Sequence, residues 1–347
     1  MLAFVFISKD KHHCNNSTGY DIIYPKTTKF KNSKERDSAM NRFRKLALKA
    51  FTLPINLKKT YRLHRKVVIV AHPYRKKLYN YQDKKIMCEG RKIPVRIFKS
   101  DTPKGFKVLV FFHGGGWVTG NNKSYSRICA NMANRTGYPV VSVDYRLAPE
   151  HPFPAGVNDC YAVAKEISTN GAFFGKKPDE VILIGDSAGG NLAAVVSLLA
   201  RDRNEFFPSK QILLYPLVNN DHSENSPYAS VRENGTGYLL TAKRICDYMD
   251  LYIKKEEERY NPYVAPLLAE DLSNQPDTLI ITAEYDPLRD EGEAYGMRLL
   301  EHGNKVIIRR IPGALHGFLS LPKNSACVLY CYDIINRFLH EEIKYET

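Results

Sequence analysis

The sequence predicts an α/β fold in which helices cover both faces of a mostly parallel central sheet. Short apolar runs with the length of buried strands alternate with stretches that favour helices. Parallel strands need crossover connections, so this alternation is typical of a parallel sheet covered on both sides. The predicted strands lie near Val108, Val140, Val181, Ile212, Leu279 and Val306. The predicted helices lie near Ser124, Val157, Leu192, Glu291 and Val328.

A sharp turn of small residues follows the predicted strand at residues 181–184. It reads Gly185-Asp186-Ser187-Ala188-Gly189-Gly190, and the next ten residues favour a helix. A strained turn from strand to helix accepts only small neighbours, and it exposes the serine hydroxyl above the N-terminus of the helix. This pattern predicts a nucleophile elbow with Ser187 as the nucleophile. The turn by itself is also compatible with an ordinary glycine-rich connection.

A second glycine-rich motif, His113-Gly114-Gly115-Gly116-Trp117, follows the predicted strand at residues 107–112. Acyl transfer places negative charge on the former carbonyl oxygen, and backbone N–H groups approach that oxygen closely only where no Cβ intervenes. The glycines therefore indicate an oxyanion hole. The expected donors are the amides of Gly114, Gly115 and Ala188. Standing alone, the motif is also compatible with a flexible turn.

An acid and a base are expected further along the chain, each after a predicted strand. Asp286 follows the strand at residues 278–283, and His316 follows the strand at residues 305–311. Taken singly, Asp286 fits a helix N-cap and His316 fits a loop histidine. The chain order Ser187, Asp286, His316 is, however, the order of the catalytic triad in α/β hydrolases, and it differs from the order in two other serine-hydrolase folds.

Six separated motifs together resemble the hormone-sensitive-lipase-like serine esterases of the α/β-hydrolase superfamily. The resemblance extends from about Val108 to Phe338. It implies that Ser187 attacks an ester carbonyl, that a covalent acyl-enzyme forms, and that water then releases the acid. The motifs are residues 113–117, 144–155, 185–190, 261–263, 286–290 and 316–318.

The motif at residues 144–155 is expected to have a structural role. In the family that the sequence resembles, this segment supports the oxyanion loop from below. The favoured interpretation is a buried ion pair between Asp144 and Arg146. Neither of these residues, nor Glu150, is expected to be catalytic.

Two segments fall outside the alternation and form the expected cap. They are residues 36–82 and residues 218–260; the second comes between two sheet strands and has a helical stretch from Ala242 to Lys254. The resemblance implies the same, because family members cover the site with N-terminal helices and such an insertion. Residues 1–35 are expected to be irregular and residues 83–347 to form the catalytic domain. Candidate substrate-binding residues, each also compatible with plain packing, are Trp117, Tyr238, Leu239 and Phe318.

Positive charge is concentrated in the first third of the chain. Residues 1–107 contain 27 Lys and Arg against 7 Asp and Glu, whereas the whole chain carries a net charge of +14. Residues 37–51 fit a basic amphipathic helix. The favoured interpretation is a cap helix with a solvated basic face, and the alternative is an element that binds a membrane surface. No recognised motif for nucleic acids accompanies the charge, so nucleic-acid binding is not expected.

No cofactor or metal is expected, because we find no zinc-ligand or phosphate-cradling pattern. The seven cysteines are odd in number and have no paired spacing, which argues against the disulfide framework of a secreted protein. Cys327 and Cys331, one helical turn apart, are expected to pack in the C-terminal helix. We find no signal peptide and no apolar stretch of 18 residues, so the expected compartment is the cytoplasm. Met40 is a second candidate for the biological start.

The expected activity is that of a serine carboxylesterase that hydrolyses short-chain, acetyl-like esters of small molecules. A membrane-surface lipase is an alternative, as is an amidase or sugar deacetylase with the same triad. A non-catalytic ligand receptor on the same fold is a further alternative. It is disfavoured because such receptors typically lose the catalytic histidine, and His316 is present.

Overall fold

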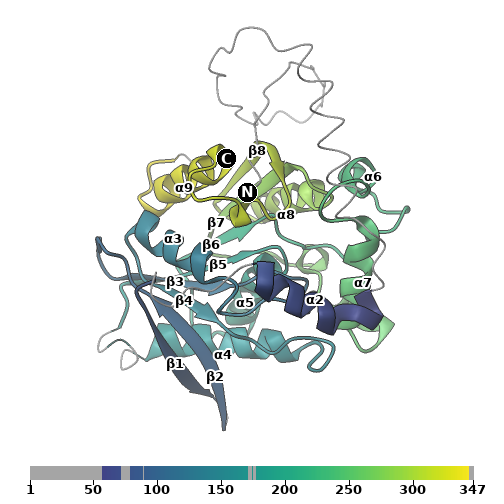
Figure 1. Ribbon diagram of the computed structural model, residues 1–347. Coiled ribbons are helices and arrows are strands. Elements are labelled where there is room, and N and C mark those ends of the chain that lie inside the picture. Colours follow the sequence, from purple (N-terminus) through teal and green to yellow (C-terminus); the bar gives the residue numbers. More distant parts are fainter. Residues whose placement is uncertain (1–56, 72–78, 89, 171–173, 175–176, 344–347) are drawn as a thin grey trace.

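The computed structural model describes residues 57–71, 79–88, 90–170, 174 and 177–343. Its centre is one eight-stranded sheet in the order β1-β2-β4-β3-β5-β6-β7-β8 (Figure 1). Strands β3 to β8 pair in parallel, whereas β1 and β2 form an antiparallel edge. The strands are β1 (Tyr81–Cys88), β2 (Arg91–Phe98), β3 (Lys107–Phe112), β4 (Val140–Val143), β5 (Glu180–Asp186), β6 (Lys210–Leu214), β7 (Asp277–Tyr285) and β8 (Val306–Leu315).

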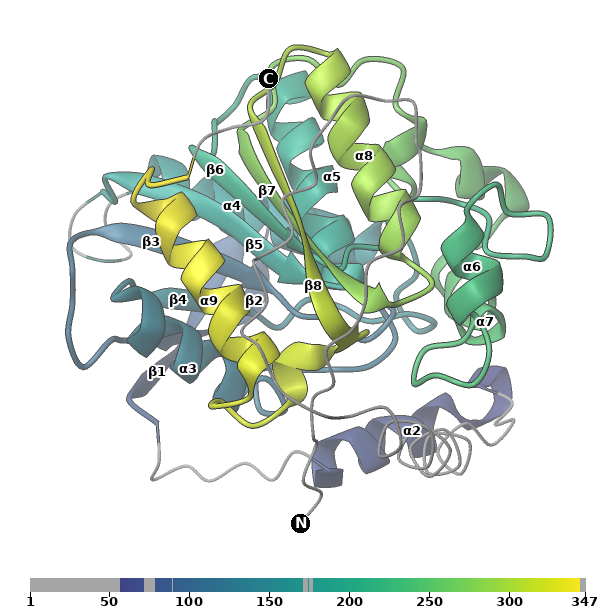
Figure 2. The ribbon, with the colours of Figure 1, turned by 90° about the horizontal axis from the view of Figure 1, so that it is seen from above.

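Helices cover both faces of the sheet, as the alternating pattern predicts (Figure 2). One face packs against α3 (Ser126–Thr136) and α9 (Ala326–Leu339). The other packs against α4 (Ala155–Thr169), α5 (Ala188–Arg203) and α8 (Arg289–Glu301). The predicted mostly parallel sheet is thus confirmed. Cys327 and Cys331 lie buried in α9, and all six cysteines among the described residues are free.

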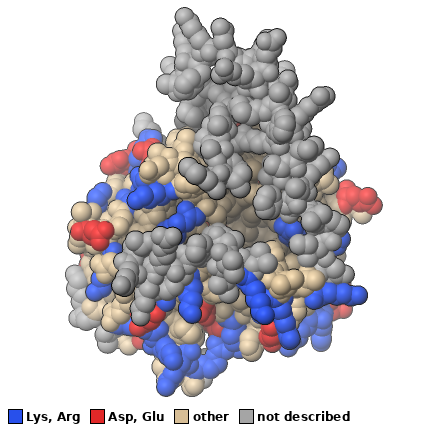
Figure 3. Space-filling view, in the orientation of Figure 1, with Lys and Arg blue, Asp and Glu red and all other residues tan. Residues whose placement is uncertain are grey.

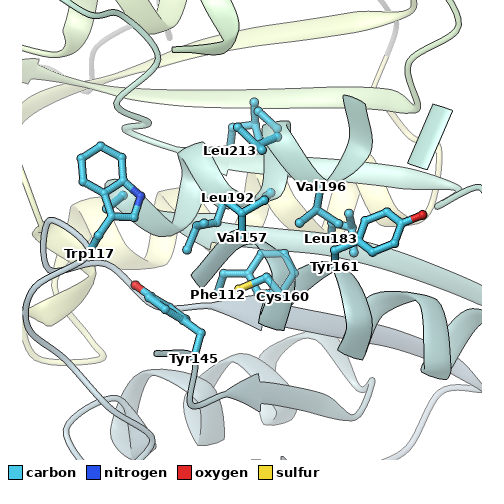
Figure 4. Close-up of a cluster of buried hydrophobic side chains, with 14 of the residues drawn as sticks. Phe112, Trp117, Tyr145, Val157, Cys160, Tyr161, Leu183, Leu192, Val196 and Leu213 are labelled. Atoms are coloured by element: carbon cyan, nitrogen blue, oxygen red, sulfur yellow. The ribbon is translucent and has the colours of Figure 1, made fainter. Parts of the chain in front are cut away.

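Two separate hydrophobic cores result from the apolar strands. Successive side chains of a strand point to opposite faces, so a strand that is apolar throughout supplies both cores. In β3, Phe112 lies in one core and Phe111 in the other, and both are fully buried. Figure 4 shows the first core, where Phe112 and Leu183 of the sheet lie near Leu192 of α5.

The hairpin of β1 and β2 is not among the predicted strands. β1 begins at Tyr81, so the hairpin crosses the predicted boundary between residues 82 and 83. Few of the β1 positions are buried and apolar; one of them is Ile86, which faces the buried Ile93 across the register. The outer positions, such as Lys85, are exposed. An edge strand can remain polar on one side, and this weakens its signal in the sequence.

Three helices lie outside the two layers, near the carboxyl ends of the strands. They are α2 (Leu57–Ala71), α6 (Ala229–Asn234) and α7 (Ala242–Tyr252), and the short 3-10 turns are η3 (Glu256–Tyr260), η4 (Pro266–Leu268) and η5 (Phe318–Ser320). The stretch predicted to be helical, residues 242–254, is α7, which ends two residues earlier. Helix α2 packs against α7, and Lys58 Nζ lies 2.7 Å from Asp250 Oδ2. The predicted irregular segment 1–35, the predicted helix 37–51 and Met40 lie outside the described residues.

Part of the basic N-terminal charge is engaged by acidic groups of later segments. Figure 3 shows Lys and Arg side chains along the lower edge of the molecule, where Figure 1 places the β1–β2 hairpin. Arg65 pairs with Glu150, and Arg91 pairs with Asp159. In the part of the chain that the structure describes, every helix is too short or too polar to span a bilayer. The same residues hold no group of three or more His, Cys, Asp or Glu suited to a metal ion.

Candidate active site

Ser187 lies at the sharp turn between β5 and α5 with a backbone conformation that is rare for residues other than glycine. Its φ is 55° and its ψ is −123°. Such a conformation costs about 1–3 kcal/mol, and close packing on every side maintains it here. A Cβ added to Gly185 would lie 2.1 Å from the carbonyl oxygen of Gly189, and one added to Gly189 would lie 2.0 Å from that of Phe112. The small residues of the turn are therefore sterically required.

The structure brings Ser187, His316 and Asp286 together in a chain of hydrogen bonds. His316 Nε2 lies 2.9 Å from Ser187 Oγ, and His316 Nδ1 lies 2.7 Å from Asp286 Oδ2. The other oxygen of Asp286 accepts a hydrogen bond from the Leu288 amide at 3.0 Å. Asp286 is fully buried, whereas the His316 side chain is 13% exposed. This arrangement fixes the imidazole and leaves Nε2 facing the serine hydroxyl.

The glycine loop after β3 differs in one respect from the prediction. The Gly114 amide donates a hydrogen bond to Asp186 Oδ1 at 2.8 Å, so the prediction that Gly114 is an oxyanion donor is wrong. Its neighbours Gly115 and Gly116 have φ values of 113° and 61°. Within the described residues, the amides of Gly115, Gly116 and Ala188 meet no hydrogen-bond acceptor. These three N–H groups are candidates for binding an oxyanion.

Comparisons with known proteins identify the family of the chain. A family model described as the alpha/beta hydrolase fold matches residues 109–320. This chain is an α/β hydrolase. An arylesterase from Saccharolobus solfataricus is 40% identical over 245 residues, which are 70% of this chain and 78% of that protein. The carboxylic ester hydrolase LipN from Mycobacterium tuberculosis is 38% identical over 268 residues, 75% of this chain and 70% of LipN.

Solved structures of esterases are also similar to this α/β hydrolase. An esterase from Pyrobaculum calidifontis superposes with a TM-score of 0.73 at 36% identity, and the match covers 83% of this chain and 93% of that one. The resemblance to hormone-sensitive-lipase-like esterases is thus confirmed, and the protein is a carboxylic ester hydrolase.

Asp186 is a site residue of the hydrolase that the sequence analysis missed. Its buried carboxylate accepts hydrogen bonds from the Gly114 amide and from Tyr125 Oη, the latter at 3.1 Å. Burial raises the pKa of Asp186 to about 6, because a charged carboxylate loses its hydration there. The carboxylate thereby ties the glycine loop to the nucleophile elbow. Its signal in the sequence is a charged residue in a turn whose other members are small.

The segment at residues 144–155 supports the glycine loop, but through other partners than predicted. Arg146 forms a bidentate ion pair with Asp159 of α4, at 3.0 and 2.9 Å, and not with Asp144. The predicted pair is therefore wrong, because Asp159 is brought close by a helix and not by the local sequence. Tyr145 Oη donates a hydrogen bond to the His113 carbonyl at 2.7 Å, and the two rings stack.

Two of the four candidate substrate-binding side chains are packed in the interior. Trp117 is 1% exposed and stacks on Tyr252, with ring centroids 4.1 Å apart. Phe318 is 2% exposed and meets the ring of Tyr215 edge to face. Neither is accessible to a substrate in this structure, so packing accounts for both, and the prediction that they bind substrate is not supported.

The other two candidates, Tyr238 and Leu239, lie at the surface between α6 and α7. Leu239 is 41% exposed. The partly buried Tyr238 stacks on Tyr285 at the end of β7, with ring centroids 5.9 Å apart. Both side chains therefore remain candidates for contact with a substrate.

Helix α6 is bonded to the loop that contains Asp286. The Ser230 hydroxyl donates a hydrogen bond to the Pro287 carbonyl at 2.8 Å, and the Ser230 amide donates to Asp290 Oδ2 at 2.7 Å. Asn234 Nδ2 lies 3.4 Å from the carbonyl oxygen of Asp286. The second carboxylate of this loop, Asp290, is thus engaged by α6 and by Arg289, away from the histidine.

Proposed function

We propose that this ester hydrolase is a serine carboxylesterase that cleaves short-chain acyl esters through an acyl-enzyme intermediate. The observation that carries the proposal is the hydrogen-bonded chain Ser187–His316–Asp286 beside three backbone amides that meet no acceptor among the described residues. Nucleophile, base, orienting carboxylate and oxyanion donors are the four parts that acyl transfer requires.

The reaction follows from this geometry in two half-reactions. Ser187 Oγ attacks the ester carbonyl while His316 Nε2 takes the hydroxyl proton, and Asp286 stabilises the imidazolium that forms. The amides of Gly115, Gly116 and Ala188 bind the negative oxygen of the tetrahedral intermediate. His316 then protonates the leaving alcohol and the acyl-enzyme remains. Water, deprotonated by His316, repeats the sequence and releases the acid.

A preference for short acyl chains is supported by the cap and by one relative. We assign α2 and the inserted segment 218–260 to this cap. An ethyl acetate hydrolase from Pseudomonas putida is 34% identical to this chain over 237 residues, which are 67% of this chain and 73% of that protein. Beside the glycine loop, Trp117 and Tyr248 are buried, so a long chain finds no accessible surface on them. We expect activity to be highest with acetyl to hexanoyl esters.

A series of p-nitrophenyl esters from acetyl to dodecanoyl tests the acyl preference. We expect kcat/KM to fall sharply by the twelve-carbon ester, since each methylene beyond the pocket must remain in water or in unfavourable contact. A maximum on long-chain triglyceride emulsions, with activation at the oil–water interface, would instead identify a lipase.

Covalent labelling tests the nucleophile. A fluorophosphonate should modify Ser187 alone, and Ser187→Ala should lose both labelling and ester hydrolysis while it keeps the far-UV circular dichroism of the parent. Labelling that persists in Ser187→Ala would show that another residue is the nucleophile.

We also propose a cytoplasmic location. The support is that all six cysteines among the described residues are free, as expected for a reducing compartment. Cell fractionation with an antibody to the protein tests this. Recovery of the protein in the membrane or extracellular fraction would contradict the proposal.

A further inference from the structure

The glycine loop, residues 114–119, is held by the two cap helices α2 and α7 as well as by the sheet. We propose that Arg65 of α2 and Tyr248 of α7 are positioning residues that fix the loop amides for the oxyanion. The inference rests on the proposed role of Gly115 and Gly116 as oxyanion donors. It gives the cap a part in the chemical step in addition to covering the substrate.

Arg65 reaches from α2 to the backbone of two loops. Its Nε donates a hydrogen bond to the Val118 carbonyl at 2.6 Å, and its Nη2 donates to the Ala148 carbonyl at 2.7 Å. The Ala148 amide in turn donates to the Trp117 carbonyl at 2.9 Å. Glu150 holds the guanidinium in place through bonds of 3.0 and 2.8 Å. The planar guanidinium has donors in fixed directions, so it can fix both the position and the orientation of the carbonyl groups that it binds. The single ammonium group of a lysine cannot.

Tyr248 closes the loop from the side of α7. A Cβ added to Gly116 would lie 2.3 Å from Tyr248 Cγ, so the ring covers this glycine directly. Tyr248 is 8% exposed, and its Oη lies 3.3 Å from Nε2 of His64 in α2. Burial lowers the pKa of His64, which favours a neutral ring that can accept this hydrogen bond. One helical turn later, Tyr252 stacks on Trp117.

The two contacts meet the loop at one of the proposed donors, Gly116, and two residues beyond it. Tyr248 touches the loop at Gly116, and Arg65 binds it at Val118. An oxyanion donor is effective only within about 2.7–3.1 Å of the charged oxygen, and a displacement of about 1 Å costs up to roughly 100-fold in rate. Loosening either contact should therefore weaken binding of the transition state and leave binding of the ester ground state nearly unchanged.

The test uses four variants of the full chain. Arg65→Gln removes the forked donor, and Arg65→Lys keeps the charge for Glu150 without the fork. Tyr248→Leu removes the ring, and Tyr248→Phe removes only the hydroxyl, which contacts His64 and the Thr119 side chain of the loop. Lys58→Gln is the matched control, because it breaks the α2 ion pair with Asp250 and does not touch the loop.

Two ligands separate the transition state from the ground state. In an alkyl trifluoromethyl ketone, Ser187 Oγ adds to the carbonyl carbon and its proton moves to His316, which leaves a hemiketal oxyanion in the hole. The matching methyl ketone binds without forming this adduct to a comparable extent. The measured quantities are the inhibition constants of both ketones and the kcat and KM for p-nitrophenyl acetate.

We expect Arg65→Gln and Tyr248→Leu to lower kcat about 10- to 100-fold, with KM within about threefold of the parent. Affinity for the trifluoromethyl ketone should fall by the same factor as kcat/KM, and affinity for the methyl ketone should not change. Arg65→Lys and Tyr248→Phe should show smaller losses of the same kind, and they carry the test if the first pair fails to fold. Lys58→Gln should match the parent.

Unchanged kcat and unchanged trifluoromethyl ketone affinity in the folded variants would overturn the positioning role. Equal losses for both ketones, or a matching loss in Lys58→Gln, would also overturn it, because they would indicate a general disturbance of the cap. Failure of the proposed function looks different: the parent protein would then lack labelling at Ser187 or sensitivity to the trifluoromethyl ketone.

Discussion

Two histidine–carboxylate pairs take their buried acids from neighbouring positions in the chain, and the structure gives the pairs different tasks. Asp286 binds His316 at 2.7 Å, and five residues later Glu291 binds His222 at 2.6 Å. Both carboxylates are fully buried, so neither distance nor burial of the acid distinguishes the pairs.

The pairs differ in which ring nitrogen holds the carboxylate and in what lies beyond the ring. His316 uses Nδ1, and its Nε2 meets Ser187 Oγ. His222 uses Nε2 and is 1% exposed, and the other oxygen of Glu291 accepts hydrogen bonds from the Val218 and Asn219 amides. A histidine becomes a base only when its second nitrogen faces a nucleophile. The second pair instead anchors the start of the inserted segment to α8.

The largest effect is expected from the catalytic pair. Asp286→Asn should reduce kcat on the order of 10⁴-fold, because an amide stabilises the wrong tautomer of His316. The equivalent substitution in a serine protease has an effect of this size. The melting temperature should stay near that of the parent. Asp290→Asn is the control, since Asp290 binds Ser230 and Arg289 and not the histidine. It should lose less than about tenfold in kcat, and the reverse ranking would move the catalytic role to Asp290.

The structural pair should show the opposite profile. Glu291→Ala leaves two backbone amides and a buried imidazole without a partner, so the free energy of unfolding should fall by about 3–5 kcal/mol. Glu291→Gln retains an acceptor oxygen, so its free energy of unfolding should fall much less. Urea denaturation measures both. At a temperature where the variants are folded, kcat should stay within about tenfold of the parent, and a loss as large as that of Asp286→Asn would contradict the division of tasks.

Asp186 extends the comparison, because it is a buried carboxylate that accepts hydrogen bonds from the Gly114 amide and from Tyr125 Oη. Burial raises its pKa to about 6 in the folded protein. The folded state therefore binds the proton more tightly than the unfolded chain, and this stabilisation is complete below about pH 4 and lost as the pH rises through about 6. Compared with Asp186→Asn, the parent should lose about 2–3 kcal/mol of unfolding free energy between pH 4 and pH 7.5. A constant difference across this range would contradict the raised pKa.

The sequence predicted those parts of the site that depend on local geometry. The elbow around Ser187 requires small residues at fixed spacing, and the packing around Gly185 and Gly189 shows why. Likewise, Asp286 and His316 follow the parallel strands β7 and β8, whose carboxyl ends meet at one edge of the sheet. Such requirements leave a readable pattern in the chain.

The errors arose where a distant residue decides the outcome. The Gly114 amide donates its hydrogen bond to Asp186, which is 72 residues away in the chain. The glycine motif alone therefore led to Gly114 being predicted as an oxyanion donor. Trp117 is covered by Tyr252 of the inserted segment, and the sequence around Trp117 does not predict that contact. Arg146 pairs with Asp159 of α4, and the sequence next to Arg146 does not indicate this partner. The hairpin of β1 and β2 was missed because β1 is mostly polar and exposed.

The wide spacing of the site residues along the chain has a consequence for folding kinetics. Ser187 and His316 are 129 residues apart, and Arg65 and Val118 are 53 apart. Contacts between distant segments close late, after local helices have formed and the chain has collapsed. On refolding from urea, helical circular dichroism should therefore return before esterase turnover does. The hydrolysis of a chromogenic ester would then time the last step of folding, when the segments that contain Ser187, Asp286 and His316 come together.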